Sequence, residues 1–489
     1  MTSVFAKPIS STEPQCTPEP AGRLIYGTAE PFDPGRALDV KGRGLPGNPA
    51  YIPANMRNKD MLTGQFQAGA SNDLCFGFTL TPNMEAGVVR TSPTGTAGFR
   101  IQEDPPVPDR AGTHAWTAGT DEDLEDAIIE LPAGFAGDPD SLPSCTEEQF
   151  GLTNYLDVGC PANTVAGTVY ARLTTDLRFD GGSVRTHLAT GGFPNPTGSL
   201  SDGGIVYNLP HGPNELARLG VAIRPVDNIL PTKFVVKLAL TPTGRVSTVV
   251  EGAPKVAYYF DPAFPEDTLT PEGQLLPGVI PSPLYLEALA IRAWGSATGH
   301  PTLSKDFAEW GTDCSTPAKA SMTVKTSLGN ESSMDSNAFT MTGCESLPFL
   351  PAVDVTTTEK RPGVPTATNV KVTLGQTTSG PRAALLKNAE VTLPPGLEIG
   401  AQVASGANGL PLCTAAQFAK DSGAANTCPA GSKAGDVTII TPLQSRPFVG
   451  SAYLGEQSAI GELPPLYLEL APEGATAADA PRIKLTGSV

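Results

Sequence analysis

Residues 145–169 read CTEEQFGLTNYLDVGCPANTVAGTV, and residues 413–437 read CTAAQFAKDSGAANTCPAGSKAGDV. The two stretches align without a gap, and they share both cysteines, the Thr and Gln-Phe after the first cysteine, and the Pro-Ala, Gly and Val after the second. The match extends upstream to a Leu-Pro-x-Gly motif (131–134 and 393–396) and downstream to Gly-x-x-Tyr (204–207 and 450–453). So many identities in register indicate two copies of one module.

Each copy predicts the same local structure. Thr146-x-x-Gln149 and Thr414-x-x-Gln417 have the pattern of capping boxes that open a short helix, with Phe150 and Phe418 facing inward. Strands are expected after the second cysteine, over 165–173 and 435–441. Alternation in Ala389-Glu-Val-Thr-Leu393 predicts a further strand that Pro-Pro-Gly ends.

The cysteine pattern predicts disulfides rather than a metal or redox site. No two cysteines have C-x-x-C spacing, and a zinc site needs three or four converging Cys or His ligands. Nearest neighbours are therefore expected to pair, with the first pair assigned by elimination, and the bonds require an oxidising compartment. The four predicted pairs are Cys16–Cys75, Cys145–Cys160, Cys314–Cys344 and Cys413–Cys428.

Composition points to an all-β fold. Gly (52) and Pro (49) make up about a fifth of the 489 residues, which is typical of many short strands joined by turns. We expect tandem β-sandwich modules with short helices and disulfide-closed loops. Further strands are predicted over 217–223, 233–240, 283–291, 465–470 and 482–485, and a hairpin from 320–328 and 337–342.

The length predicts several domains. We expect a Pro/Gly-rich N-terminal region over 1–63, a first module with insertions over 64–295, a disulfide-closed hairpin segment over 296–349 and a second module over 350–489. The match between the copies stops at Val489, before counterparts of the later strands of copy one. An incomplete second module is therefore expected, in a chain that is a piece of a longer one.

Charge and hydropathy exclude two classes of partner. The formal net charge of −17, with no basic run, argues against nucleic acid. No apolar run approaches the roughly 18 residues that span a bilayer, and the N-terminus lacks the apolar core of a signal peptide. We still expect an extracellular or cell-surface protein, because the disulfides require it.

No motif of a catalytic or cofactor site is found. Gly42-x-Gly44-x-x-Gly47 contains Pro46, which forbids the helix that a dinucleotide-binding loop needs, and no histidine lies in a triad context. The acidic residues Asp121, Asp123 and Asp126 are weak calcium candidates, but they lack an EF-hand pattern and suit a solvated turn. We therefore predict no catalytic residue and no cofactor.

The repeated motif, C-T-x-x-Q-F followed by C-P-A-x4-G-x-V, resembles a module of large secreted actinobacterial repeat proteins of uncharacterised function. The strand Phe76-Gly-Phe-Thr-Leu80 resembles the one that opens such modules, and the resemblance covers residues 64–489. It implies export and modular β architecture, and it assigns no functional residues.

Two hypotheses of function follow. The first is a non-enzymatic structural surface protein, whose modules act as spacers and whose partners are other surface or repeat proteins, or itself. The second is an adhesin that recognises a glycan or a protein through the insertion at 176–202. A secreted hydrolase is a minor alternative.

Overall fold

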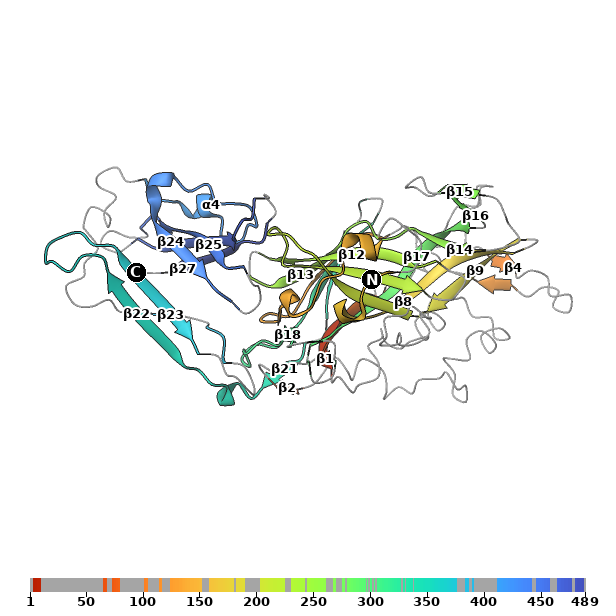
Figure 1. The fold of residues 1–489 in the computed structure, drawn as a ribbon, viewed down its shortest axis with the longest axis horizontal. Helices are drawn as coiled ribbons and strands as arrows, with labels where there is room; N and C mark the ends of the chain where they lie inside the picture. Colours follow the sequence, from red (N-terminus) through yellow and green to blue (C-terminus); the bar gives the residue numbers. More distant parts are fainter. Residues whose placement is uncertain are drawn as a thin grey trace.

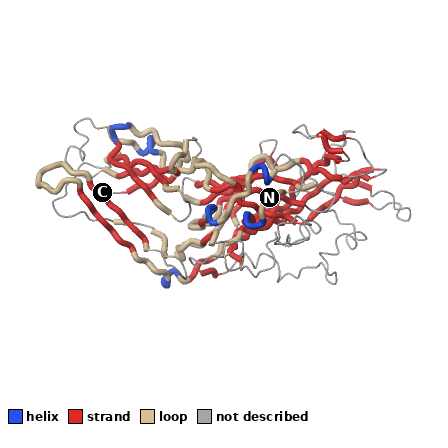
Figure 2. The backbone as a smooth tube through the Cα atoms, in the orientation of Figure 1, coloured by secondary structure: helices blue, strands red, loops and turns tan. Residues whose placement is uncertain are grey.

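The computed structural model confirms the all-β prediction (Figures 1 and 2). Its described residues hold twenty-seven strands and only two α-helices, α2 (Glu147–Phe150) and α4 (Ala415–Phe418). The described residues are 3–9, 65–67, 73–79, 101–103, 114–116, 124–151, 158–179, 182–189, 203–224, 230–241, 244–260, 267–269, 275–277, 279–295, 297, 300, 303, 306–326, 329, 331–336, 338–375, 383–386, 389–390, 411–441, 446–457, 464–476 and 480–487.

One antiparallel sheet of thirteen strands dominates the first two thirds of the chain. Its terminal strands β1 and β20 contact one another, so the sheet curls around its own interior. In order along the sheet, the strands are β1 (Ser3–Ile9), β3 (Asp73–Thr79), β17 (Val279–Ala293), β8 (Val165–Phe179), β10 (Gly203–Leu209), β11 (Ala217–Arg224), β12 (Thr232–Leu240), β13 (Val246–Val250), β6 (Leu124–Glu130), β19 (Ser321–Thr326) and β20 (Glu331–Asp335), with β14 (Val256–Phe260) paired to β17 and β9 (Gly182–Ala189) to β8.

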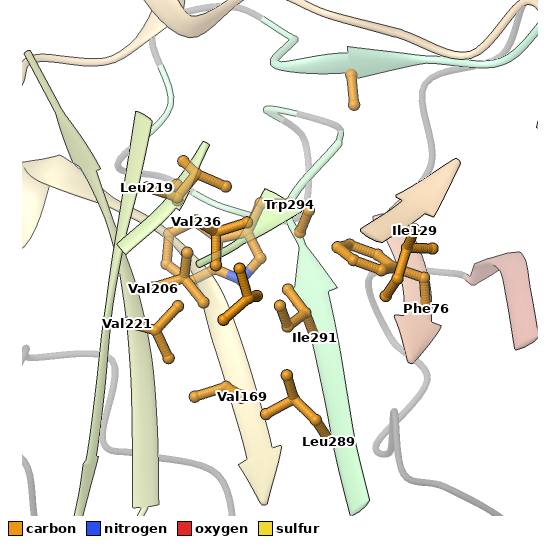
Figure 3. Close-up of a cluster of buried hydrophobic side chains, with 14 of the residues drawn as sticks. Phe76, Ile129, Val169, Val206, Leu219, Val221, Val236, Leu289, Ile291 and Trp294 are labelled. Carbon is orange, nitrogen blue, oxygen red and sulfur yellow. The ribbon is translucent and has the colours of Figure 1, made fainter. Parts of the chain in front are cut away.

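The core lies inside this curled sheet (Figure 3). Val206 on β10 lies opposite Val221 on β11, and Val221 lies opposite Phe234 on β12, so one apolar row crosses three strands. Leu289 and Ile291 on β17 join them, and all five side chains are buried. Burial of β-branched and aromatic side chains on one face of a pleated sheet is the main driving force for this arrangement.

The remaining sheet structure of the first region is small. Four two-stranded sheets accompany the large one among the described residues. They are β2 (Gln65–Gln67) with β21 (Thr340–Thr342), β4 (Ile101–Glu103) with β5 (His114–Trp116), β7 (Ala136–Gly137) with β18 (Ala308–Glu309), and β15 (Asp267–Leu269) with β16 (Leu275–Pro277). The short 3₁₀ turns are η5 (Pro139–Ser141), η6 (Ala162–Thr164), η7 (Cys344–Ser346) and η8 (Ala430–Ser432).

The second region consists of a hairpin and a four-stranded sheet (Figure 1). The hairpin joins β22 (Pro351–Thr357) to β23 (Thr368–Leu374). The antiparallel sheet has the order β24 (Lys433–Ile439), β25 (Phe448–Leu454), β26 (Leu466–Pro472) and β27 (Ile483–Gly487). No described strand of the hairpin pairs with the sheet.

Most strand predictions are confirmed, and one is wrong. β19 pairs with β20, at 331–335, and not with the predicted 337–342, whose last residues form β21 and pair with β2. The sequence Glu331-Ser-Ser-Met-Asp335 carries no β-branched residue, so its pairing depends on its neighbour and not on propensity.

β19 also pairs with β6, and β1 with β3, so segments from 1–63 and 296–349 share one sheet with 64–295. Of the strand predicted over 389–393, the structure describes only 389–390, which are not in a strand.

Candidate functional site

The two disulfide-closed loops are the feature that the repeat defines, and both predicted capping boxes are present. The N–H of Gln149 donates to Thr146 Oγ1 and the N–H of Thr146 to Gln149 Oε1, both at 3.1 Å. The same reciprocal pair joins Thr414 and Gln417, at 2.9 and 3.0 Å. These bonds satisfy the free N–H groups at the start of α2 and α4.

Three of the four predicted disulfides are confirmed. They are Cys145–Cys160 and Cys413–Cys428, each closing a separation of 15 residues, and Cys314–Cys344, which spans 30. Cys16 lies outside the described residues and the side chain of Cys75 is not described, so that pair stays a prediction. All three bonds lie within the chain. They stabilise the fold because they reduce the conformational entropy of the unfolded state.

Each loop covers the outer face of its sheet at the same position. The N–H of Cys145 donates to Asn208 O at 2.8 Å, and the N–H of Cys413 donates to Leu454 O at 2.9 Å. Asn208 directly follows the Tyr of the Gly-x-x-Tyr motif in copy one, and Leu454 follows it in copy two. The first cysteine of each copy is therefore fixed to the same point of the second strand.

The registers of the sheets repeat as well. Val169 lies opposite Gly204, and Val437 lies opposite Gly450. Both strand pairs then skip one residue, Ala166 or Ala434, in a β-bulge before they reach Tyr207 or Tyr453. β8, β10, β11 and β12 thus correspond to β24, β25, β26 and β27.

Close packing explains the shared glycine of the Gly-x-x-Tyr motif. A Cβ on Gly204 would lie 2.7 Å from Val169 O, and one on Gly450 would lie 1.8 Å from Glu469 O. Neither position has room for a side chain, so the motif reflects backbone approach between strands.

The phenyl ring after each capping box is buried on the outer face. Phe150 lies against Gly220, where a Cβ would come within 2.7 Å of the ring, and it meets Tyr207 edge to face at 6.1 Å. In copy two, Tyr467 occupies the position of Gly220, and Phe418 stacks on it with ring centroids 4.6 Å apart. At this position, Gly220 leaves room for the phenyl ring in copy one, and Tyr467 stacks on the ring in copy two.

Each disulfide-closed loop and its short helix form a cap on the outer face of the sheet. In both copies a lysine that was not predicted from the sequence binds this cap. Lys233 Nζ donates to Gly151 O at 3.0 Å, and Lys484 Nζ donates to Phe418 O at 2.8 Å and to Ala419 O at 3.0 Å. Lys233 and Lys484 occupy the same register position on β12 and β27. Each ammonium neutralises the carbonyl groups that a short helix leaves free at its C-terminus. The sequence marks this position only weakly: the lysine is the second residue of 232–240 and of 483–487, and the first of these strands also contains Lys237.

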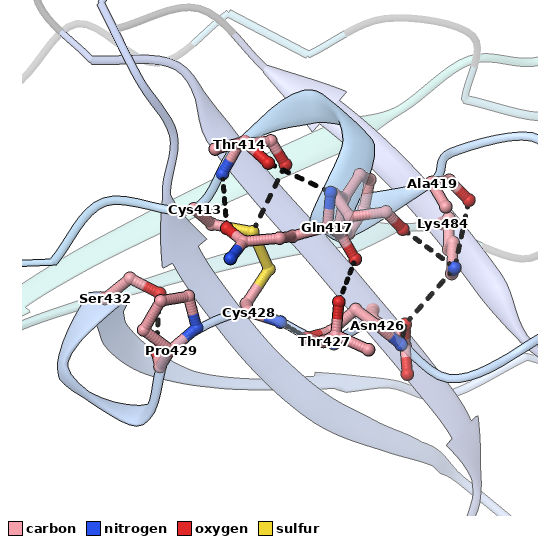
Figure 4. Close-up of a disulfide and its surroundings, with 12 residues drawn as sticks. Cys413, Thr414, Gln417, Ala419, Asn426, Thr427, Cys428, Pro429, Ser432 and Lys484 are labelled. Carbon is pink, nitrogen blue, oxygen red and sulfur yellow. Dashed lines mark hydrogen bonds and ion pairs between the residues drawn. A yellow bond between two sulfur atoms is a disulfide. The ribbon is translucent and has the colours of Figure 1, made fainter.

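Copy two adds a buried charge cluster to this cap. Figure 4 shows Lys484 beside the disulfide loop. Lys484 has a fully buried side chain and lies 3.6 Å from Glu469, which also lies 3.4 Å from Arg482 and accepts from the N–H of Asn426 at 2.8 Å. In copy one the register position of Glu469 holds Ala222. The cluster ties the disulfide loop to β26 and β27, and each charge in it has a partner.

Only one of the three candidate calcium residues, Asp126, is described, so the predicted grouping is not tested. Asp121 and Asp123 lie outside the described residues. Asp126 lies on β6, where its carboxylate accepts the N–H of Gly252 at 3.2 Å. The described part of the chain holds no group of three or more His, Cys, Asp or Glu that could bind a metal.

The structure describes the side chains of two of the four histidines, His211 and His300. The ring of His300 stacks on Trp294 with centroids 4.3 Å apart, and His211 Nε2 lies 3.8 Å from Asp140 Oδ1. His114 and His187 lie on β5 and β9, and their side chains are not described.

Gly42, Gly44 and Gly47 lie outside the described residues, as do the side chains of the insertion at 176–202. Within the described ranges, no helix has the length and apolar character needed to cross a bilayer.

The inner faces of the two sheets differ sharply. Phe234 is 6% exposed, whereas Leu485 at the matching position of β27 is 43% exposed. Val169 and Val221 are buried, whereas their counterparts Val437 and Leu468 are only half-buried. Phe448 and Leu470 are buried at one end of the second sheet. The second copy therefore presents the same outer cap over a partly open inner face.

Comparison of the chain with protein-family models, with curated proteins and with solved structures finds no match in any of the three.

Proposed function

We propose that this chain is a non-enzymatic extracellular repeat protein whose modules act as spacers and assembly units at a cell surface. The observation that carries the proposal is what the two copies share. The shared side chains close a disulfide, cap a helix, fill the space beneath the cap or hold its C-terminus. Shared side chains that stabilise a shape suit a spacer better than an enzyme, whose modules would share reacting groups.

An oxidising location fits the same features. Three disulfides lie within the described residues, and such bonds persist outside the cytosol. The net charge of −17 would keep an exposed protein dispersed and would repel polyanions. Both features suit a protein that is exposed to the extracellular medium.

A chain that bears load should unfold in steps whose lengths the disulfides set, and single-molecule pulling between the termini tests this. Reduction should lengthen the unfolded chain by roughly 50 Å for each bond of separation 15 and by roughly 100 Å for the bond of separation 30. The matched control is a chain with Cys145→Ser and Cys160→Ser, which should lose one increment of roughly 50 Å.

Two results would contradict the proposal. One is free thiols at these cysteines in protein taken from its native cells under acid quench. The other is any turnover that a single substitution abolishes, for example His211→Ala.

A further inference from the structure

The base of the hairpin is firmly attached to the first region. The N–H of Ala384 donates to Pro348 O, and the N–H of Leu385 donates to Thr312 Oγ1, both at 2.9 Å. Ala384 also packs against the core of the first region. The disulfide Cys314–Cys344 joins the two stretches of chain that accept these bonds. This attachment therefore combines hydrogen bonds, apolar packing and a covalent link.

The four-stranded sheet contacts the first region at a second place. The N–H of Thr476, in the loop after β26, donates to Asn214 Oδ1, in the turn between β10 and β11, at 3.0 Å. In the same loop, a Cβ on Gly474 would lie 3.9 Å from Pro213 Cβ, so the loop and the turn lie against one another. The hydrogen bond is exposed to solvent. In Figure 1 the hairpin and the sheet leave the first region on the same side, as two arms.

This second contact is a non-covalent shortcut between the two regions. Asn214 and Thr476 are 262 residues apart in the chain. The covalent path between them passes through the base of the hairpin, along β22 and β23, and on to the sheet. Among the described residues, no strand of the sheet pairs with the hairpin or with the first region. A force that separates the two regions therefore acts on the shortcut before it stretches the covalent path.

The two attachments should open at different forces. An exposed hydrogen bond adds little to stability, because water competes for both of its groups. The contact also lies beyond Pro472, the last residue of β26, and it involves no residue of the cap. It can open without loss of a strand or of the disulfide Cys413–Cys428. The base of the hairpin should hold at forces that open this contact.

We propose that the contact between the turn at 213–214 and the loop at 474–476 is a latch that opens reversibly under load while both modules stay folded. The second region then moves away from the first about the base of the hairpin, and the molecule lengthens before any strand is lost. A pulling force favours the open state because that state is longer, and the closed state returns when the load is removed. This inference rests on the proposed spacer role and adds a load-dependent length to it.

Single-molecule pulling on the full chain, with its native disulfides intact, tests the latch. A reversible lengthening should appear at a lower force than the first unfolding step. It should be absent in a chain with Pro213→Cys and Gly474→Cys once these two cysteines are oxidised, because the Cβ separation of 3.9 Å lies within the range of a disulfide. The matched control is the same variant alkylated before oxidation, which should still lengthen. Peptide mapping verifies the new bond and the native ones.

Asn214 provides a second pair of matched variants. Asn214→Leu removes the acceptor at similar size, and it should raise the ratio of open to closed molecules at a given force by about two- to tenfold. Asn214→Asp keeps an oxygen that accepts the N–H of Thr476, so it should hold the latch at least as well as the unaltered chain. An unchanged urea transition, detected by tryptophan fluorescence, shows that the first region has folded in both variants.

Three results would overturn the proposal. They are no lengthening before the first unfolding step, equal lengthening in the chain that is locked between 213 and 474, and equal effects of the leucine and aspartate variants. The spacer role is tested by the unfolding steps that the native disulfides set and by the thiol measurement, and neither depends on the latch. Failure of the latch and failure of the spacer role therefore remain distinguishable.

Discussion

The two copies of the module share an outer cap and differ in what covers the inner face. Val221 and Phe234 lie in a closed core, whereas Leu468 and Leu485 at the same register positions remain partly in contact with water. The caps, in contrast, repeat down to single hydrogen bonds. The repeated motif therefore encodes a capped four-stranded unit, and the cover of its inner face comes from strands that the motif does not include.

This difference predicts two regions that unfold separately. The described hydrogen bonds of each cap go to its own loop and sheet, so its contribution to stability should stay within its module. All three tryptophans, Trp116, Trp294 and Trp310, belong to the first region, so tryptophan fluorescence reports on that region alone.

The largest expected effect is the removal of a phenyl ring from beneath a cap. Phe150 and Phe418 are each 1% exposed, and truncation of a buried Phe to Ala costs about 3–5 kcal/mol. Phe150→Ala should lower the free energy of unfolding by that amount in the tryptophan-detected urea transition. Phe418→Ala should leave that transition unchanged and should increase hydrogen exchange in 433–454.

Phe150→Leu is the matched control, and it should cost less than about 1.5 kcal/mol. An equal shift of the tryptophan transition by Phe150→Ala and Phe418→Ala would mean that the two regions fold as one unit. The comparison between them would then lose its basis.

The next effect concerns the disulfides, which should contribute equally to the two copies. Cys145–Cys160 and Cys413–Cys428 close the same separation of 15 residues, for which loop closure predicts about 3 kcal/mol each. Replacement of either pair by alanine should therefore produce the same loss, measured by regional hydrogen exchange. A loss in one copy with none in the other would show that the caps are not equivalent in energy.

A smaller effect should separate the two lysines. Lys484 has Glu469 at 3.6 Å, whereas Lys233 has Ala222 at that position. A double-mutant cycle of Lys484→Met and Glu469→Ala should give a coupling energy of about 1–2 kcal/mol, since the two charges are buried and in contact. The matched variant Lys233→Met should behave as the loss of one charge-assisted bond, about 1.5–3 kcal/mol. A coupling near zero would mean that Arg482 and Asn426 alone hold Glu469.

Local patterns in the sequence were sufficient to predict the caps and three disulfides. A capping box lies within four residues, and the second copy repeats its Thr and its Gln, so no tertiary contact is needed to recognise it. The lysines were missed because a lysine in a strand is typical of a solvent-facing position. Their role depends on the register between β12 or β27 and a loop that lies far away in the chain, at 151 or at 418–419.

Strand pairing was the least predictable part of the fold. β20 is formed by Glu331-Ser-Ser-Met-Asp335, a polar segment that does not have the pattern of a strand. Met334 lies opposite Met322 on β19, and this pairing holds the segment in the sheet. The cover of the inner face in the second copy was equally hard to predict, because alternation in a strand shows which side chains face inward but not what covers them.

The smallest effect concerns the hairpin β22–β23, neither face of which is covered by a described strand. Its turn contains Glu359, whose pKa is lowered to about 2, first by the side-chain bond from Arg361 at 2.6 Å and then by the N–H groups of Arg361 and Lys360. A lowered carboxyl pKa means that the turn gains stability above the ordinary value of 4.5 and loses it as the pH falls toward about 2. Arg361→Gln should raise the pKa of Glu359 in an NMR titration of its carboxyl carbon, whereas the matched Lys360→Gln should not, since Lys360 contributes only its N–H. If Glu359 titrates near 4.5 in the unaltered chain, the three bonds to its carboxylate do not form in solution, and the turn gains no stability from them.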